Sequence, residues 1–242
     1  MPIRKGDGAA IQSVRLGDGT QISEIRKGDG TVLWQSNTVP DSGDLRARYD
    51  FSQEDGSTTV TDQTGNGNDL TGNYSGVGVS INGVQAGEFD GVNDLLDVTF
   101  AAESQPNTVF IVFEQISDTG DNAAIFDGDS KLSHALLEDV QDNAYEIFAG
   151  SRIGGSTTRS VGDVEVVSGL FDGANSVLRI DGTQDATGDV GSGSLNGFTL
   201  GGQGDDSNYS NVKIGELLDY PQDKSGIFGD VENYLINKWG PV

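Results

Sequence analysis

The polar and apolar positions along most of this chain follow the patterns of β-strands. Residues 45–51 alternate, which predicts one strand face made of Leu45, Ala47, Tyr49 and Phe51. Residues 108–115 are mostly β-branched or aromatic and predict a central strand that is buried on both faces. Further strands are predicted over residues 144–148, 164–171, 176–181 and 198–200.

Turn signals separate several of these segments. Asp-Gly pairs stand at residues 127–128, 172–173 and 181–182. Strands and turns at this spacing indicate an all-β chain folded as a two-sheet antiparallel sandwich. One short C-terminal helix is predicted over residues 227–238, because apolar residues recur there at intervals of three and four, and Gly240-Pro241 follows.

The first 35 residues contain a small N-terminal β-repeat. An aliphatic residue, an arginine and a Gly-Asp-Gly triplet recur at residues 3–8, 14–19 and 25–30. The triplets are typical of turns, since glycine adopts positive φ and Asp can bond its own backbone. Residues 36–44 are polar, include Pro40 and predict a linker to a domain of residues 45–242.

Apolar residues of the repeat point to both faces of its strands, because residues three apart in a strand face opposite ways. A segment this short cannot cover both faces by itself, so we expect other chains to complete it. The predicted assembly residues are Ile3, Ile11, Val14, Ile22, Ile25, Leu33 and Trp34. The alternative is a small hairpin packed on its own domain.

Charge separates the two parts of the chain. The whole sequence has 38 acidic and 14 basic residues and a formal net charge of −24. The first 35 residues hold five bases and four acids, so this segment could dock on an acidic partner. The overall negative charge excludes a nucleic-acid clamp that works by neutralising phosphates.

Composition narrows the chemistry further. The chain has no cysteine, which excludes disulfides, Cys-zinc sites and thiol chemistry, and its one histidine, His134, cannot build a multi-histidine metal site. The acids are scattered and resemble those of proteins from extreme halophiles, where strong salt screens self-repulsion. An ordinary acidic β-protein and a calcium-rich extracellular protein are the alternatives.

No segment predicts membrane insertion. The longest apolar run, residues 109–113, is far shorter than the ~20 residues of a membrane-spanning helix. The first residues also lack the apolar stretch of a secretory signal peptide. We therefore expect any export to follow another route, such as release inside an assembled virus particle.

Residues 45–242 resemble the laminin-G-like and concanavalin-A-like jelly rolls. The motifs that carry this resemblance are Asp-Gln-Thr-Gly-Asn-Gly-Asn at residues 62–68, Phe-Asp-Gly-Val-Asn-Asp at 89–94, Ile-Gly-Glu-Leu-Leu-Asp-Tyr at 214–220 and Val-Glu-Asn-Tyr-Leu at 231–235. The resemblance implies a two-sheet antiparallel jelly-roll sandwich. It also implies a module that binds glycans or extracellular proteins, often with calcium, whereas a minority of such folds are glycoside hydrolases or lyases.

The N-terminal repeat has a resemblance of its own. Short aliphatic-x-x-Gly-x-x-x-aliphatic units that end in an aromatic residue, here Trp34, are similar to the N-terminal segments of tailed-virus structural proteins. Together with the halophile-like composition, this implies a structural protein of a tailed virus that infects a halophilic archaeal host.

The carboxylates give no pattern for glycoside hydrolysis, which needs two carboxyls ~5–9.5 Å apart. The nearest candidates are Glu138 with Asp139, Glu165, and Glu216 with Asp219. Glu216 and Asp219 are three apart on a strand and should face opposite ways. Ser133 and His134 are strand neighbours and should also diverge, so we expect that the chain is not an enzyme.

Oxygen-rich loops make calcium the one candidate cofactor, since Ca²⁺ takes six to eight oxygen ligands. Asp90, Asn93 and Asp94 lie within five residues, and Asp62 belongs to a second loop of this kind. These four are the predicted metal ligands. The alternative is that they only form tight turns, which use the same residue types.

The predicted ligand-binding residues are Asp205, Asp206 and Asn208, in the Gly-rich loop of residues 201–208. Loops on a rigid scaffold commonly carry binding, and this one is rich in hydrogen-bonding groups. The second choices are Tyr74, Tyr145 and Arg152.

These observations predict a virion structural and adhesion protein. Residues 1–35 would bind other virion proteins and form a homo-oligomer on the capsid or tail. The sandwich would face outward from the virion surface and attach to a host-surface glycan or glycoprotein. The alternatives are a secreted or cell-surface carbohydrate-binding module, and a capsid decoration protein that binds no ligand.

Overall fold

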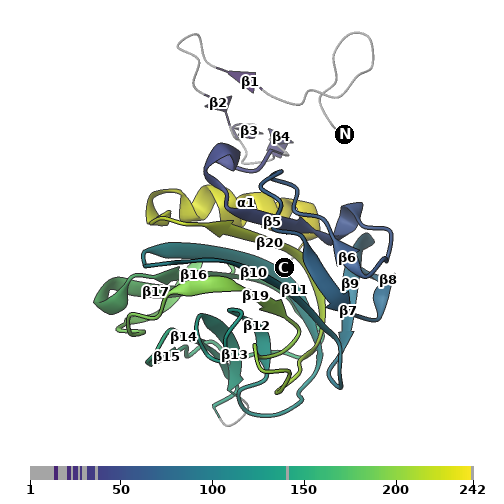
Figure 1. Cartoon of the computed structure of the whole chain (residues 1–242). Helices are drawn as coiled ribbons and strands as arrows, with labels where there is room; N and C mark the ends of the chain where they lie inside the picture. The colour runs from purple at the N-terminus through teal and green to yellow at the C-terminus, as the bar shows by residue number, and fades with distance from the viewer. Residues whose placement is uncertain are drawn as a thin grey trace.

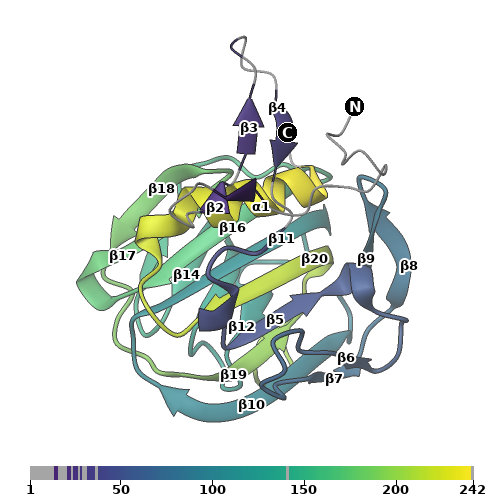
Figure 2. The ribbon, with the colours of Figure 1, turned by 90° about the horizontal axis from the view of Figure 1, so that it is seen from above.

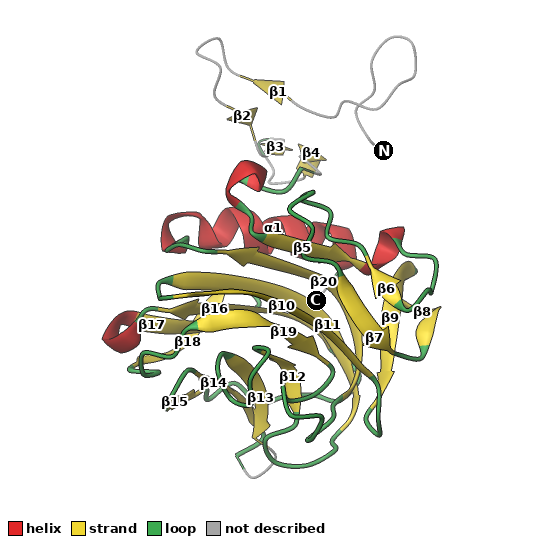
Figure 3. Ribbon diagram, viewed as in Figure 1, coloured by secondary structure: helices red, strands yellow, loops and turns green. Residues whose placement is uncertain are grey.

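A computed structural model describes residues 14–15, 21–22, 24–26, 28, 32–35, 38–139 and 142–240. Most of them form two antiparallel eight-stranded sheets (Figures 1 and 3). Sheet I contains, in spatial order, β18 (Thr183–Gly188), β17 (Ser176–Ile180), β16 (Val164–Phe171), β11 (Asn107–Ser117), β20 (Asn211–Tyr220), β9 (Val84–Asp90) and β8 (Gly76–Ile81), with β5 (Ala47–Asp50) paired to β20. Sheet II contains β15 (Arg152–Gly154), β14 (Ala144–Phe148), β13 (Ala135–Asp139), β12 (Ala124–Asp127), β19 (Leu195–Leu200), β10 (Leu95–Glu103), β7 (Leu70–Asn73) and β6 (Thr59–Val60).

The predicted all-β sandwich is confirmed, and its central strand is buried on both faces as expected. Val109, Ile111 and Phe113 of β11 pack between the two sheets, whereas Phe110 and Val112 point to the outer face of sheet I. This double burial arises because successive side chains of a strand point to opposite faces and residues 109–113 are all apolar.

Helix α1 (Phe228–Trp239) covers the outer face of sheet I (Figure 2). Its bounds differ by one residue from the predicted helix, and Gly240 ends it in the left-handed conformation, at φ 70°. Trp239, the last residue of α1, is fully buried and packs against Gly215 of β20. The second apolar cluster of the protein therefore lies between α1 and sheet I.

One detail of the predicted strand over residues 45–51 is wrong. Ala47, Tyr49 and Phe51 share the core between the sheets, but Leu45 belongs to the outer cluster under α1. The reason is that β5 begins only at Ala47, so the alternation does not extend back to Leu45. Short 3₁₀ turns complete the fold: η1 (Ser42–Asp44), η2 (Phe51–Gln53), η3 (Gly173–Asn175) and η4 (Ser225–Ile227).

The described parts of the N-terminal repeat form two antiparallel strand pairs. β1 (Val14–Arg15) pairs with β2 (Gln21–Ile22), and β3 (Glu24–Arg26) pairs with β4 (Val32–Gln35). Among the predicted assembly residues, Ile3 and Ile11 lie outside the described residues. Assembly through this segment stays a prediction.

Part of the predicted linker packs on the sandwich. Val39 is buried, the Pro40 carbonyl accepts a hydrogen bond from Tyr220, and Lys224 forms ion pairs with Asp41 and Asp44. Residues 39–44 are therefore attached to the domain that follows them. Within the described part of the chain, no helix is long and apolar enough to cross a membrane.

The contact between Gly215 and Trp239 makes a testable prediction. A Cβ at Gly215 would lie 2.8 Å from the Trp239 ring. We expect Gly215→Ala to lower the free energy of unfolding by about 1–3 kcal/mol, as overpacking does. Chemical denaturation measures this.

Gly229 provides the matched control. It lies in α1, and no atom is within 4 Å of its added Cβ. Gly229→Ala should therefore raise stability by about 0.5–1 kcal/mol, since alanine loses less entropy than glycine in a helix. Equal effects of the two substitutions would contradict the proposed packing.

Candidate functional site

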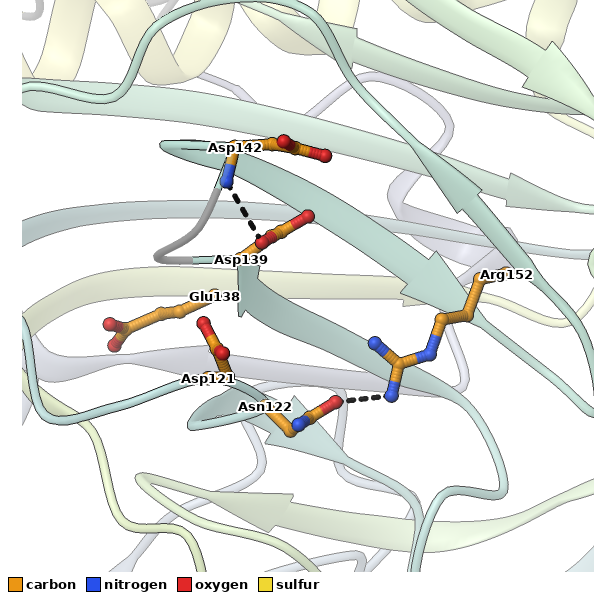
Figure 4. A pocket seen from close by; sticks show the side chains of 6 residues that line it. All are labelled: Asp121, Asn122, Glu138, Asp139, Asp142 and Arg152. Carbon is orange, nitrogen blue, oxygen red and sulfur yellow. Dashed lines mark hydrogen bonds between the residues drawn. The ribbon is translucent and has the colours of Figure 1, made fainter.

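A polar pocket lies where β12 begins and β13 ends, at one end of sheet II. Its volume is about 200 Å³, and the described residues that line it are Asp121, Asn122, Glu138, Asp139, Asp142 and Arg152 (Figure 4). They come from the segment before β12, the β13–β14 hairpin and the start of β15. Strand pairing brings these three segments together, because β12, β13, β14 and β15 are consecutive neighbours in the sheet.

Arg152 is held in place on the wall of this pocket. Its Nη1 donates to Glu146 Oε2 at 2.5 Å, and its Nη2 donates to Asn122 Oδ1. The guanidinium also lies 6.0 Å from the centre of the Phe148 ring. These contacts preorganise the guanidinium while its side chain stays 41% exposed.

The opposite wall belongs to the β13–β14 hairpin. The backbone N–H of Asp142 donates to Asp139 Oδ1 at 3.1 Å (Figure 4). Asp142 is exposed, and Asp139 is half-buried. Carboxylate acceptors thus stand across the pocket from a guanidinium donor, which suits a ligand that both donates and accepts hydrogen bonds.

Glu138 is the fully buried member of the lining. Its Oε2 accepts from Gln115 Nε2 at 2.6 Å and from Arg159 Nη1 at 3.3 Å. Burial raises the pKa of Glu138 to about 7, although the Arg159 charge and the Ser210 hydroxyl act in the opposite direction.

A buried polar network continues from Glu138 into the sandwich. Gln115 Oε1 accepts from Tyr145 at 3.2 Å and from Arg159 at 2.7 Å, and Arg159 also pairs with Asp118 at 2.9 Å. Burial raises the pKa of the neighbouring Glu165 to about 7. The sequence named Glu138 and Glu165 separately, but only the fold shows that they share one network.

The predicted ligand residues lie outside this pocket, on a loop that packs against β12. Asp205 forms an ion pair with Lys131 at 2.9 Å, and this hydrogen bond lowers the pKa of the Asp205 carboxyl. Asp206 donates its N–H to the Gln203 carbonyl, and the Asn208 carbonyl accepts from Ala124. The loop therefore supports the segment that carries Asp121 and Asn122, to which Gln203 is also bonded.

The second-choice residues have three different positions. Arg152 lines the pocket. Tyr145 is fully buried beneath it, and Tyr74 is half-buried against Phe51 and Phe89. Of the residues predicted to contact a ligand, the structure thus brings one, Arg152, into the pocket.

The predicted calcium ligands hold turns in the structure. Asp94 accepts from the Asp90 N–H at 3.1 Å and the Ser75 hydroxyl at 2.6 Å, and Asp90 accepts from the N–H groups of Val92 and Asn93. In the second loop, Asp62 accepts N–H groups of Arg48, Thr64 and Asn68. Among the described residues, no three carboxylates or histidines are grouped to hold a metal ion. Calcium binding stays a prediction.

The other residues considered for catalysis in the sequence analysis have structural contacts in the fold. His134 is buried against Phe171, with ring centres 4.6 Å apart, and burial lowers its pKa to about 4. Glu216 faces α1, where it accepts from Tyr234 and Trp239, whereas Asp219 pairs with Arg46. The expected divergence of Glu216 and Asp219 is thus what the structure shows.

Comparisons with known proteins give structural neighbours only. No protein-family model matches the sequence, and no curated protein matches it significantly. The Trypanosoma rangeli sialidase in complex with sialic acid is similar over 90% of this chain and 36% of its own, with a TM-score of 0.64 and 12% identity. Domain 4 of AbnA, a GH43 extracellular arabinanase from Geobacillus stearothermophilus solved with arabinotriose, is similar over 78% of this chain and 97% of its own, with a TM-score of 0.56 and 19% identity.

These neighbours confirm the β-sandwich and belong to carbohydrate-active proteins. At such low identity the likeness shows the fold alone, and this chain spans about a third of the length of the sialidases it matches. The narrower resemblance to laminin-G-like domains stays a prediction.

The expectation that the chain is not an enzyme needs correction. Several of the structural neighbours are sialidases, so the same fold occurs within enzyme chains. The expectation was wrong because it rested on carboxylate spacing along the sequence. Spacing does not reveal which carboxylates the fold brings together, such as Glu138 with the pocket residues before β12.

The raised pKa of Glu138 predicts a pH-dependent stability. A carboxyl with a native pKa of about 7, above its usual 4.5, contributes stability that is fully present below pH 4.5 and is lost as pH rises through about 7. Each such group contributes at most about 3 kcal/mol. The titration of Glu138 should make the wild type less stable at pH 8 than at pH 5. We expect Glu138→Gln to reduce this loss of unfolding free energy by about 1–3 kcal/mol.

Urea denaturation at both pH values measures this difference. Glu165→Gln is the companion variant and should act in the same direction, because burial raises its pKa as well. An unchanged pH dependence in both variants would show that these carboxyls do not titrate as described.

Proposed function

We propose that this chain is a carbohydrate-binding protein and that its ligand occupies the polar pocket of sheet II. The observation that carries the proposal is the convergence of Asn122, Asp139, Asp142 and Arg152 from three chain segments on one pocket. Sugar hydroxyls both donate and accept hydrogen bonds, and these side chains offer both functions at fixed positions. Small-molecule sites commonly use such convergent polar groups.

The size of the pocket limits the ligand. About 200 Å³ is below the ~300–1,000 Å³ that is usual for small-molecule sites. A single sugar residue is therefore the unit that we expect to enter it, with the rest of a glycan outside. Because single hydrogen bonds contribute only ~0.5–1.5 kcal/mol net, we expect weak binding at each site.

The comparisons support this proposal without deciding it. The matched region covers nearly all of the AbnA domain, which was solved with arabinotriose. Arabinotriose is thus a sensible first probe for this chain. The loop of Asp205, Asp206 and Asn208 packs beside the pocket and remains a second candidate contact surface.

Two alanine substitutions distinguish the pocket from the loop. We expect Arg152→Ala to weaken binding of a glycan selected from an array by tenfold or more, since hydrogen bonds to charged groups contribute about 1.5–3 kcal/mol. Asp206→Ala should change affinity less than twofold. Calorimetry measures both, and circular dichroism checks that the fold is kept.

The reverse order of effects would move the site to the loop, and no binding to any glycan would contradict the proposal. The same samples are assayed for released sugar, because the fold occurs in enzyme chains. Release that requires Glu138 would make the pocket a catalytic site.

We further propose that the N-terminal repeat presents many copies of this site on the surface of a tailed virus with a halophilic host. The observation that favours this role is the eleven-residue repeat, with a net charge of +1 in a chain of −24. Linking weak sites can raise avidity by ~10²–10⁴-fold. Secretion as a single module and an inert decoration of the capsid are the alternatives.

Removal of residues 1–35 tests this second proposal. We expect the full chain to form oligomers and to bind host envelopes at least a hundredfold more tightly than the truncated chain, as linked sites do. Light scattering gives the oligomeric state, and sedimentation with envelopes gives the binding. Equal binding by both chains would remove the avidity argument, and binding by neither would favour the inert decoration.

A further inference from the structure

Charge in the pocket is unevenly distributed. Four carboxylate residues line it, Asp121, Glu138, Asp139 and Asp142, against one guanidinium. Glu138 is paired with Arg159, so the other described charged residues of the lining, three carboxylates and one guanidinium, leave an excess of two negative charges within a chain of net charge −24. A ligand group that enters the pocket meets a negative field, unless the guanidinium offsets it locally.

The guanidinium is not placed to offset that field. Glu146 Oε2 is 2.5 Å from Arg152 Nη1, and Asn122 Oδ1 is bonded to Arg152 Nη2. A carboxylate ligand is best bound by two parallel N–H groups of a free guanidinium. Here both Nη atoms already have acceptors, and one of these acceptors is itself a carboxylate, so Arg152 can donate a further hydrogen bond but carries little uncompensated charge.

Glu138 lies beneath the lining and is hydrogen-bonded within the protein. It is fully buried, its Oε2 accepts from Gln115 and Arg159, and the Ser210 hydroxyl bonds to the same carboxyl. The carboxylates that a ligand can reach are therefore those of the exposed or half-buried residues of the lining, Asp121, Asp139 and Asp142. A hydroxyl group can donate to such an acceptor, but a second carboxylate cannot.

From these observations we infer that the pocket selects uncharged sugar residues, bound through their hydroxyl groups, and rejects acidic sugars. This inference rests on the proposed carbohydrate-binding function and adds the ligand class. Hydroxyl donors form charge-assisted hydrogen bonds to the carboxylates of Asp139 and Asp142. The carboxylate of a uronic or sialic acid would instead stand next to like charges.

The selection separates this chain from its sialidase neighbours. One of those structures holds sialic acid, which carries a carboxylate. A shared fold therefore does not imply a shared ligand, because the side chains of the site decide which ligand binds. In this chain those side chains are mostly acidic.

A matched pair of probes tests the inference on the full-length protein. Lactose and 3′-sialyllactose share their neutral part and differ by one acidic sugar, and arabinotriose with an array of neutral glycans extends the neutral set. At about 0.1 M salt we expect the acidic member of a pair to bind at least tenfold more weakly. The difference should shrink at 1 M KCl, where the Debye length falls from ~10 Å to ~3 Å.

Removing one charge from the pocket gives a second readout. Asp142→Asn replaces a charged acceptor with a neutral one, so we expect neutral glycans to bind more weakly than to the wild type. The acidic penalty, which is the ratio of neutral to acidic affinity within a pair, should nevertheless fall by threefold or more. Asp230→Asn is the control, since Asp230 is an exposed residue of α1, across the sandwich from the pocket. This control should leave the penalty unchanged.

The outcomes separate the two proposals. Binding of neutral glycans with an equal or stronger response to their acidic counterparts would overturn the charge selection and leave carbohydrate binding intact. A penalty that Asp142→Asn and Asp230→Asn reduce equally would mean that net charge alone, and not the pocket, causes it. No binding of any array glycan, neutral or acidic, would overturn the proposed function and this inference with it.

Discussion

Buried carboxylates are the constraint on which this structure depends. Among the described residues, four carboxylates that pair with cations expose 1% of their surface or less: Glu138, Glu216, Asp219 and Glu232. A buried charge is tolerated only when it is paired and hydrogen-bonded. Glu138 pairs with Arg159, and Glu216 pairs with Arg48 and Lys238. Asp219 pairs with Arg46, and Glu232 pairs with Arg179. Two of these pairs, Glu216 with Lys238 and Glu232 with Arg179, connect α1 to sheet I.

This pairing also shapes the surface. The chain has only 14 basic residues for 38 acidic ones, and the fold places several of the bases inside, where they pair with buried acids. The exterior is left more acidic than composition alone would make it. Among the ion-paired cations of residues 38–139 and 142–240, Arg152 and Lys131 are the most exposed, and Arg152 is the one that lines the pocket. The same distribution is the basis of the preference for uncharged ligands that we propose for that pocket.

The position of the pocket follows from the sheet. Consecutive hairpins pair β12 with β13, β13 with β14 and β14 with β15. The ends of these hairpins bring residues that are up to 31 positions apart in the chain, Asp121 and Arg152, to one wall. Beneath them, Glu138 connects the pocket to the buried network of Gln115 and Arg159.

The sequence by itself determined the elements whose causes are local. A run of β-branched and aromatic residues specified the doubly buried strand over residues 108–115, the three- and four-residue spacing specified the helix that Gly240 ends, and turn chemistry specified the antiparallel connections. The pocket depended on the tertiary structure, because strand register decides which distant side chains meet. Arg152 appeared in the sequence only as a second choice, and no local pattern marks its contacts with Asn122 and Glu146, since burial and pairing across strands are properties of the whole fold.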